Sequence, residues 1–416
     1  VAAEIGVKDK DNLSSVFVNV DQADAVKEVV TVASEIGAKD KDNLGSVFKN
    51  ADKAEDLKEV VTVASEIGAK DVTNLGSVLK NADKADSLNK VMKVAKEAIG
   101  TEATPGGEKK LDSSSLDILS STLQNADKAT ELAEVMDVAA DLGAQDATNL
   151  TNVFKNADKA DSLNKVMKVA KETLGSGDGD EKKLDSSSLD ILSSTLQNAD
   201  KAADLAEVMD AAADLGAQSA ENLTSVFQNA DKANDLKEVM NAAKDSLGTD
   251  DGSGVKKLDQ SQASFLTDTL KNADKASEMK AATDQLSSLG SDADAASLFT
   301  NLVDVGTVIK KAKDNGQDNT DFIKNVAGNA NIAKEMKAAA EQLEELGDDA
   351  DSASFFTNIV EVGSIVKKAQ DSGVEDTDFV KNMARNADIA KEMNAAAQQL
   401  DELGTDADAA SLFTNI

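Results

Sequence analysis

The chain of 416 residues is strongly acidic, with 44 lysines and arginines against 77 aspartates and glutamates and a formal charge of −33. It has no histidine, cysteine, tryptophan or tyrosine, which excludes disulfides, thiolate chemistry and the commonest general base and zinc ligand. This charge repels nucleic-acid phosphates and anionic membranes, so we expect no nucleic-acid partner and no membrane insertion.

Hydrophobic residues make up 41% of the chain, and there is one proline. Because proline interrupts helices, its near absence leaves long helical runs intact and predicts an all-α protein. No stretch approaches the ~18 consecutive apolar residues of a transmembrane helix.

One phrase, Asn-Ala-Asp followed in most copies by Lys-Ala, recurs along the chain. It begins at Asn50, Asn81, Asn125, Asn156, Asn198, Asn229, Asn272 and Asn386, with variant copies at Asn19 and Asn329. Successive copies are 31, 31, 44, 31, 42, 31, 43, 57 and 57 residues apart. Fixed periods of this size are typical of solenoids and helical arrays.

The short unit, residues 50–80, is predicted to be a helical hairpin. Asp52 is expected to cap its first helix, with Glu55 completing a capping box, and Gly68 is expected at that helix's end. The apolar positions expected to face the core are Ala54, Leu57, Val60, Val61, Ala64 and Ile67 in the first helix and Leu75, Val78 and Leu79 in the second.

The intermediate unit carries a Gly-rich insertion before its second helix, beginning at Ile99, Leu174 and Leu247. No strand is expected before these insertions and no P-loop pattern occurs in them, so we interpret them as flexible connectors. The long unit is predicted to hold three helices, near 332–346, 352–369 and 377–387.

The repeat types divide the chain into 1–98 with short hairpins, 99–272 with alternating short and loop-inserted repeats, and 273–416 with long three-helix repeats. Each unit is too small to bury its own apolar stripe, so neighbouring units must stack. The expected fold is all-α, an elongated α-solenoid or an array of small helical bundles. The unit lengths and signature residues differ from those of tetratricopeptide, ankyrin and HEAT repeats.

Both ends of the given sequence match the interior of a repeat, and joining the last residues to the first reads as an intact amphipathic helix. Two hypotheses follow: the chain is a window of a longer repetitive polypeptide, or subunits meet head to tail. In either case we expect the partner to be the chain itself, in an extended homopolymer.

Calcium is the candidate cofactor, because clustered acidic side chains and carbonyls supply the oxygens it prefers. The candidate ligands are Asp178, Asp180, Glu181 and Asp185, although no EF-hand pattern occurs and lysines lie beside them. Related acidic turns contain Asp250, Asp251, Asp259, Asp292, Asp294, Asp349 and Asp351. Capping and solvated turns are the alternative interpretation.

Glycosylation sequons occur at Asn12, Asn149 and Asn222, at one place in the short unit. The alternative is an asparagine that begins a helix. The recurring phenylalanines are expected in the core; they are Phe17, Phe48, Phe154, Phe227, Phe299 and Phe356.

These patterns predict a non-catalytic structural protein, a protomer or segment of an extracellular or cell-surface filament, sheath or layer. Divalent cations are candidate bridges between its acidic strands. The alternative is a helical scaffold or adhesin stalk that presents a protein-interaction surface.

Overall fold

The computed structural model describes residues 10–38, 40–102, 107–175, 186–214, 217, 219–250, 256–258, 263–286, 295–317, 319–346, 352–373 and 377–403. This part of the chain holds 24 α-helices and little strand, so the all-α prediction is confirmed. The chain divides into two compact units, Val1–Met209 and Asp210–Ile416. The predicted division by repeat type at residues 98 and 272 rests on a different criterion and stays a prediction.

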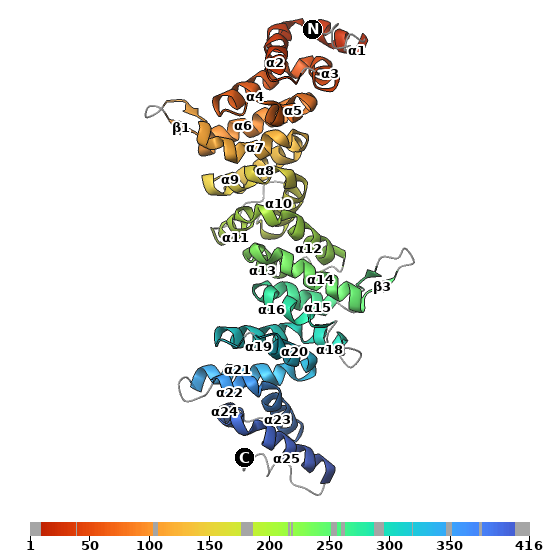
Figure 1. Cartoon of the computed structure of the whole chain (residues 1–416), viewed down its shortest axis with the longest axis vertical. Helices are drawn as coiled ribbons and strands as arrows, with labels where there is room; N and C mark the ends of the chain where they lie inside the picture. Colours follow the sequence, from red (N-terminus) through yellow and green to blue (C-terminus); the bar gives the residue numbers. More distant parts are fainter. Residues whose placement is uncertain are drawn as a thin grey trace. The chain divides into compact units, whose positions relative to one another are not determined.

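Long and short helices alternate along the first unit (Figure 1). The long helices are α2 (Ala23–Glu35), α4 (Ala54–Glu66), α6 (Ala85–Ile99), α8 (Ala129–Asp141), α10 (Ala160–Leu174) and α12 (Ala202–Asp214), the last of which contains the boundary between the units. The short helices are α1 (Lys10–Val18), α3 (Lys41–Lys49), α5 (Val72–Lys80), α7 (Leu116–Gln124), α9 (Ala147–Lys155) and α11 (Ser186–Gln197).

Helices of one kind pack on the same kind of helix in the neighbouring repeats of this unit. The long helices α2, α4, α6, α8 and α10 contact one another in that order, and so do the short helices α1, α3, α5, α7, α9 and α11. Each repeat therefore buries its apolar stripe against its sequence neighbours, which is solenoid-like stacking.

The hairpin at residues 50–80 confirms the predicted core, because all nine of its predicted inward-facing side chains are at most 5% exposed. Gly68 ends α4 with a positive φ of 81°, as a C-terminal glycine should. The predicted capping box is wrong. Asp52 lies inside a 3-10 turn, Ala51–Lys53, and the residue before α4 is Lys53, which makes no side-chain cap. That turn already leads the backbone into the helix.

An asparagine joins the short and long helices at each of twelve described joints. Its Nδ2 donates to the backbone carbonyl four residues earlier, at 2.8–3.0 Å. At most of these joints the backbone N–H of the same asparagine also donates to that carbonyl, so the side chain adds a second hydrogen bond at the end of the helix. The twelve residues are Asn19, Asn50, Asn81, Asn125, Asn156, Asn198, Asn229, Asn272, Asn301, Asn329, Asn358 and Asn386.

The described helices of the second unit follow the same alternation. The helices in the long position are α14 (Ala233–Leu247), α16 (Ala276–Thr283, which has only eight residues), α19 (Leu302–Asp314), α21 (Ala333–Leu346), α23 (Ile359–Asp371) and α25 (Ala390–Leu403), which contact one another in that order. The short helices are α13 (Ala220–Gln228), α15 (Ala263–Lys271), α18 (Ala295–Thr300), α20 (Thr320–Gly328), α22 (Ser352–Thr357) and α24 (Thr377–Arg385).

Two joint asparagines correct the prediction of three-helix units in the C-terminal third. The helix predicted over 352–369 is two helices, α22 and α23, which meet at Asn358. Asn301 likewise separates α18 from α19. Each 57-residue unit is thus a pair of hairpins of 28 and 29 residues. The periodicity was hidden because these asparagines are followed by Leu-Val and Ile-Val, without the Ala-Asp of the other joints.

Two of the three Gly-rich insertions, those that begin at Ile99 and Leu247, are flanked by short antiparallel strands, so their interpretation as flexible connectors is wrong at these strands; most of the insertion that begins at Leu174 lies outside the described residues. The pairs are β1 (Thr101–Glu102) with β2 (Lys109–Lys110), and β3 (Thr249–Asp250) with β4 (Lys256–Lys257). A lysine of β2 and one of β4 each donate to a carbonyl in the last turn of the preceding long helix. A cation in the last turn of a helix also interacts favourably with the helix dipole. Each hairpin is therefore held against its helix.

The phenylalanine prediction is confirmed at four positions. Phe154, Phe227, Phe299 and Phe356 are at most 1% exposed, and Phe48 is half-buried. Phe17 is 75% exposed, so its prediction is wrong for this structure. It lies on α1, which packs mainly on α3.

Candidate functional site

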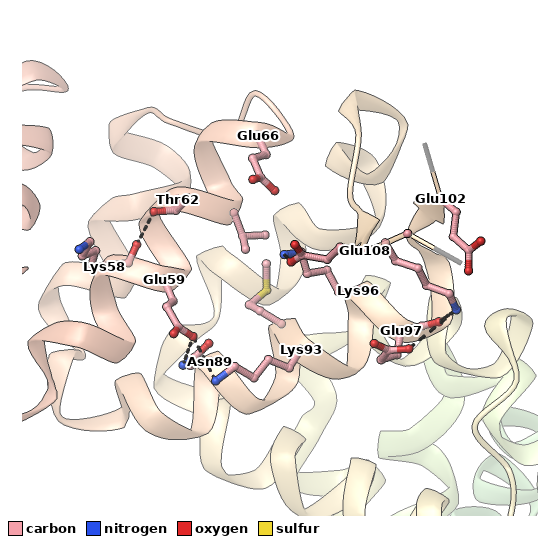
Figure 2. A pocket seen from close by; sticks show the side chains of 14 residues that line it. Lys58, Glu59, Thr62, Glu66, Asn89, Lys93, Lys96, Glu97, Glu102 and Glu108 are labelled. Carbon is pink, nitrogen blue, oxygen red and sulfur yellow. Dashed lines mark hydrogen bonds and ion pairs between the residues drawn. The ribbon is translucent and has the colours of Figure 1, made fainter. Parts of the chain in front are cut away.

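A groove of about 650 Å³ lies in the first unit between α4, α6 and the β1–β2 hairpin (Figure 2). Val63 of α4 and Met92 of α6, which are 8% and 1% exposed, contribute its apolar part. The rest of the lining is mostly charged, with four lysines and five glutamates. The groove therefore combines an apolar floor with a charged rim.

Most of the charged side chains of the groove are paired within the chain. Lys93 lies 3.1 Å from Glu59, and Lys96 lies 3.2 Å from Glu108 of the hairpin. Glu59 also accepts a hydrogen bond of 2.7 Å from Asn89. The Asn89 hydrogen bond, followed by that of Lys93, lowers the pKa of Glu59 below its ordinary 4.5, because both favour the ionised carboxylate.

Lys58 is held at the α2 side of the groove. Its Nζ lies 3.4 Å from Glu28 on α2 and 3.5 Å from Glu55 one turn earlier on α4. Glu28, and then Glu55, raises the pKa of Lys58 above 10.5. The lysine that faces α2 is thus already compensated by two carboxylates.

Glu66 differs from these neighbours, because it is exposed and has no ion-pair partner among the described residues. Figure 2 shows it on the α4 side of the groove, across from Lys96 and Glu108. At the equivalent place in the repeats that follow, Asp141 of α8 pairs with Lys171 of α10 at 2.9 Å. Lys96 of α6 is the counterpart of Lys171, but it forms its ion pair with Glu108 of the hairpin. Glu66 of α4 is therefore left without a cation.

Sequence reasoning missed this groove, because its shape depends on the insertion folding back along α6. The available signal was the Lys-Lys-Leu-Asp run that recurs at the end of the insertions, since one lysine of that run makes the contact with α6.

The predicted calcium ligands Asp178, Asp180, Glu181 and Asp185 lie outside the described residues. The related acidic turns also lie outside them, except for Asp250, which is in β3. Within the described ranges, no group of three or more acidic side chains is placed to hold a metal ion. Calcium binding stays a prediction.

The predicted glycosylation asparagines begin short helices, and two of them are buried. Asn149 is fully buried and its Nδ2 donates to Asp146 and, at 3.1 Å, to Ser193. Asn222 is 3% exposed and donates to the carbonyl of Ala217 at 2.8 Å. A glycan on either nitrogen would displace these bonds, so modification would have to precede folding. Asn12 lies in α1, and nothing is described of its side chain.

The fold places the chain in the class of tandem helical-repeat proteins. A scan against protein-family models and searches of curated proteins and of solved structures gave no match to this chain. Among the described helices, none combines the length and apolar character needed to span a membrane.

Proposed function

We propose that this chain is a structural repeat protein, a non-catalytic protomer or segment of an extended extracellular or cell-surface filament, sheath or layer. The observation that carries the proposal is that polar side chains bind the neighbouring repeat in the same way from one repeat to the next. Such uniform use of polar groups favours stacking over the presentation of a single active site.

One set of bonds runs along the joints between helices. The lysine of the Asn-Ala-Asp-Lys phrase donates to the backbone carbonyl of the aspartate in the next copy of the phrase. These pairs are Lys53 with Asp83, Lys84 with Asp127, Lys159 with Asp200, and Lys232 with Asp274. The lysine that the sequence presents as a solvated charge thus links four of the joints to the following one.

A second set of contacts joins the long helices, with the carboxylate on the earlier helix and the lysine on the later one. The pairs are Glu28–Lys58 at 3.4 Å, Glu59–Lys93 at 3.1 Å, Glu134–Lys168 at 2.6 Å, Glu238–Lys280 at 3.0 Å and Asp304–Lys337 at 2.8 Å. Exposed pairs contribute only about 0.2–1 kcal/mol each. The direction is reversed between α6 and α8, where Lys90 of the earlier helix lies 2.6 Å from Asp137 of the later one. The pairs therefore contribute more to the register of stacking than to stability.

The test is electron microscopy and sedimentation velocity of the native full-length polypeptide over a range of concentrations, with and without a calcium chelator. We expect regular filaments or sheets whose mass grows with concentration. Loss of assembly on chelation would support divalent cations as bridges between acidic strands. Dispersed monomers at every concentration, with and without calcium, would refute the structural proposal.

A further inference from the structure

We propose that the groove between α4, α6 and the β1–β2 hairpin is a docking site for a basic segment of a partner protein. A lysine or arginine of that segment pairs with Glu66, and a neighbouring apolar side chain packs on Val63 and Met92. This inference does not depend on the structural role proposed above, because it concerns one groove and a different molecule.

The size and floor of the groove suit side chains of a peptide. Its volume of about 650 Å³ falls within the ~300–1,000 Å³ of typical ligand sites. Val63, which is 8% exposed, supplies most of the apolar surface open to a partner, and Met92, which is 1% exposed, lies beneath it. Val63 and Met92 come from two adjacent long helices, so their relative position is fixed by the core beneath them.

The absence of a cation at Glu66 indicates the charge of the occupant. In the pair α8 and α10, Lys171 lies 2.9 Å from Asp141 and fills the corresponding place from within the chain. In the pair α4 and α6, Lys96 instead lies 3.2 Å from Glu108. A cation from a partner would form with Glu66 the ion pair that Lys171 forms with Asp141 two repeats further along the chain.

Charge over a longer range favours the same occupant. The groove lining carries one more carboxylate than it has lysines, and the whole chain has a formal charge of −33. Such a field attracts a basic segment and repels an acidic one.

The probe is a synthetic peptide of six residues that alternates lysine and leucine, compared with one that alternates glutamate and leucine. The full chain is labelled with ¹³C in its methionine methyl groups, and the Met92 signal is assigned with the variant Met92→Leu. We expect the lysine peptide to shift the Met92 signal saturably, and less so at high salt, while the glutamate peptide leaves it unchanged.

Two variants separate docking in the groove from general attraction to an acidic protein. Glu66→Gln should weaken binding about 1.4- to five-fold, the range for an exposed ion pair. Asp141→Asn, the matched change in the repeat that already has its lysine, should leave the affinity unchanged. The proposal is overturned if Met92 does not respond, if the other methionines shift alike, if both peptides bind equally, or if the two variants weaken binding to the same degree.

Discussion

Gly363 tests how closely the helices of the C-terminal repeats approach one another. This glycine lies within α23, and a β-carbon added to it would come 2.6 Å from Cγ of Met336, 3.2 Å from its backbone nitrogen and 3.4 Å from its Cα. Met336 lies in α21 and is fully buried. The missing side chain therefore allows α21 and α23 to pack backbone against backbone.

Two opposing effects set the magnitude of Gly363→Ala. Alanine in place of glycine stabilises a helix interior by about 1 kcal/mol. Overpacking a buried contact costs typically ~1–3 kcal/mol. Rotation of the Met336 side chain can relieve the Cγ contact, but the contacts with its backbone require the helices to separate. We therefore expect a net destabilisation of up to about 2 kcal/mol.

Gly306 and Gly76 are matched controls. A β-carbon on Gly306 would come 3.0 Å from Cγ of Met279 and 3.5 Å from its nitrogen, so alanine there should be nearly neutral. Gly76 in α5 has only Val72 Cγ2, at 4.0 Å, and alanine there should stabilise its helix by about 1 kcal/mol.

The assay is hydrogen exchange of the α21 and α23 backbone amides, because unfolding of a long repeat array does not follow two states. Gly363→Ala should speed exchange in these two helices, and Gly76→Ala should slow exchange in α5. Equal protection in Gly363→Ala and the parent chain would refute the close approach of α21 and α23.

Three further changes test the joints, the ion pairs and the core. Asn81→Ala should destabilise its repeat by about 0.5–1.5 kcal/mol, and Asn81→Asp by more because two oxygens would then face each other; hydrogen exchange of α5 checks the order. The hydrogen bond from Asn89 lowers the pKa of Glu59, so the stability that this bond contributes is present above pH 4.5 and is lost as pH falls below that value. Asn89→Ala should therefore bring the pKa of Glu59 closer to 4.5 in an NMR titration. Phe154→Ala should cost about 3–5 kcal/mol and Phe17→Ala less than ~0.5, measured by hydrogen exchange of α9 and α1; equal effects would contradict their difference in burial.

Much of the helical architecture was predictable from the sequence, because it depends on local patterns. The spacing of Leu57, Val60 and Val61 predicted a buried helix face, and Gly68 predicted a helix end, since only glycine readily takes a positive φ. The recurring Asn-Ala-Asp phrase predicted the joints of most repeats. The role of its asparagine was not predicted, because the acceptor is a carbonyl of the preceding helix.

Only the tertiary structure decided which repeats are equivalent and where the groove lies. Asn301 and Asn358 are identified as joints by the helices on either side of them, although the residues that follow them differ from those at the other joints. Lys96 and Lys171 occupy equivalent positions in similar helices, yet one pairs with the hairpin and the other with the preceding helix. That choice depends on the distance between segments far apart in sequence, which composition and periodicity do not contain.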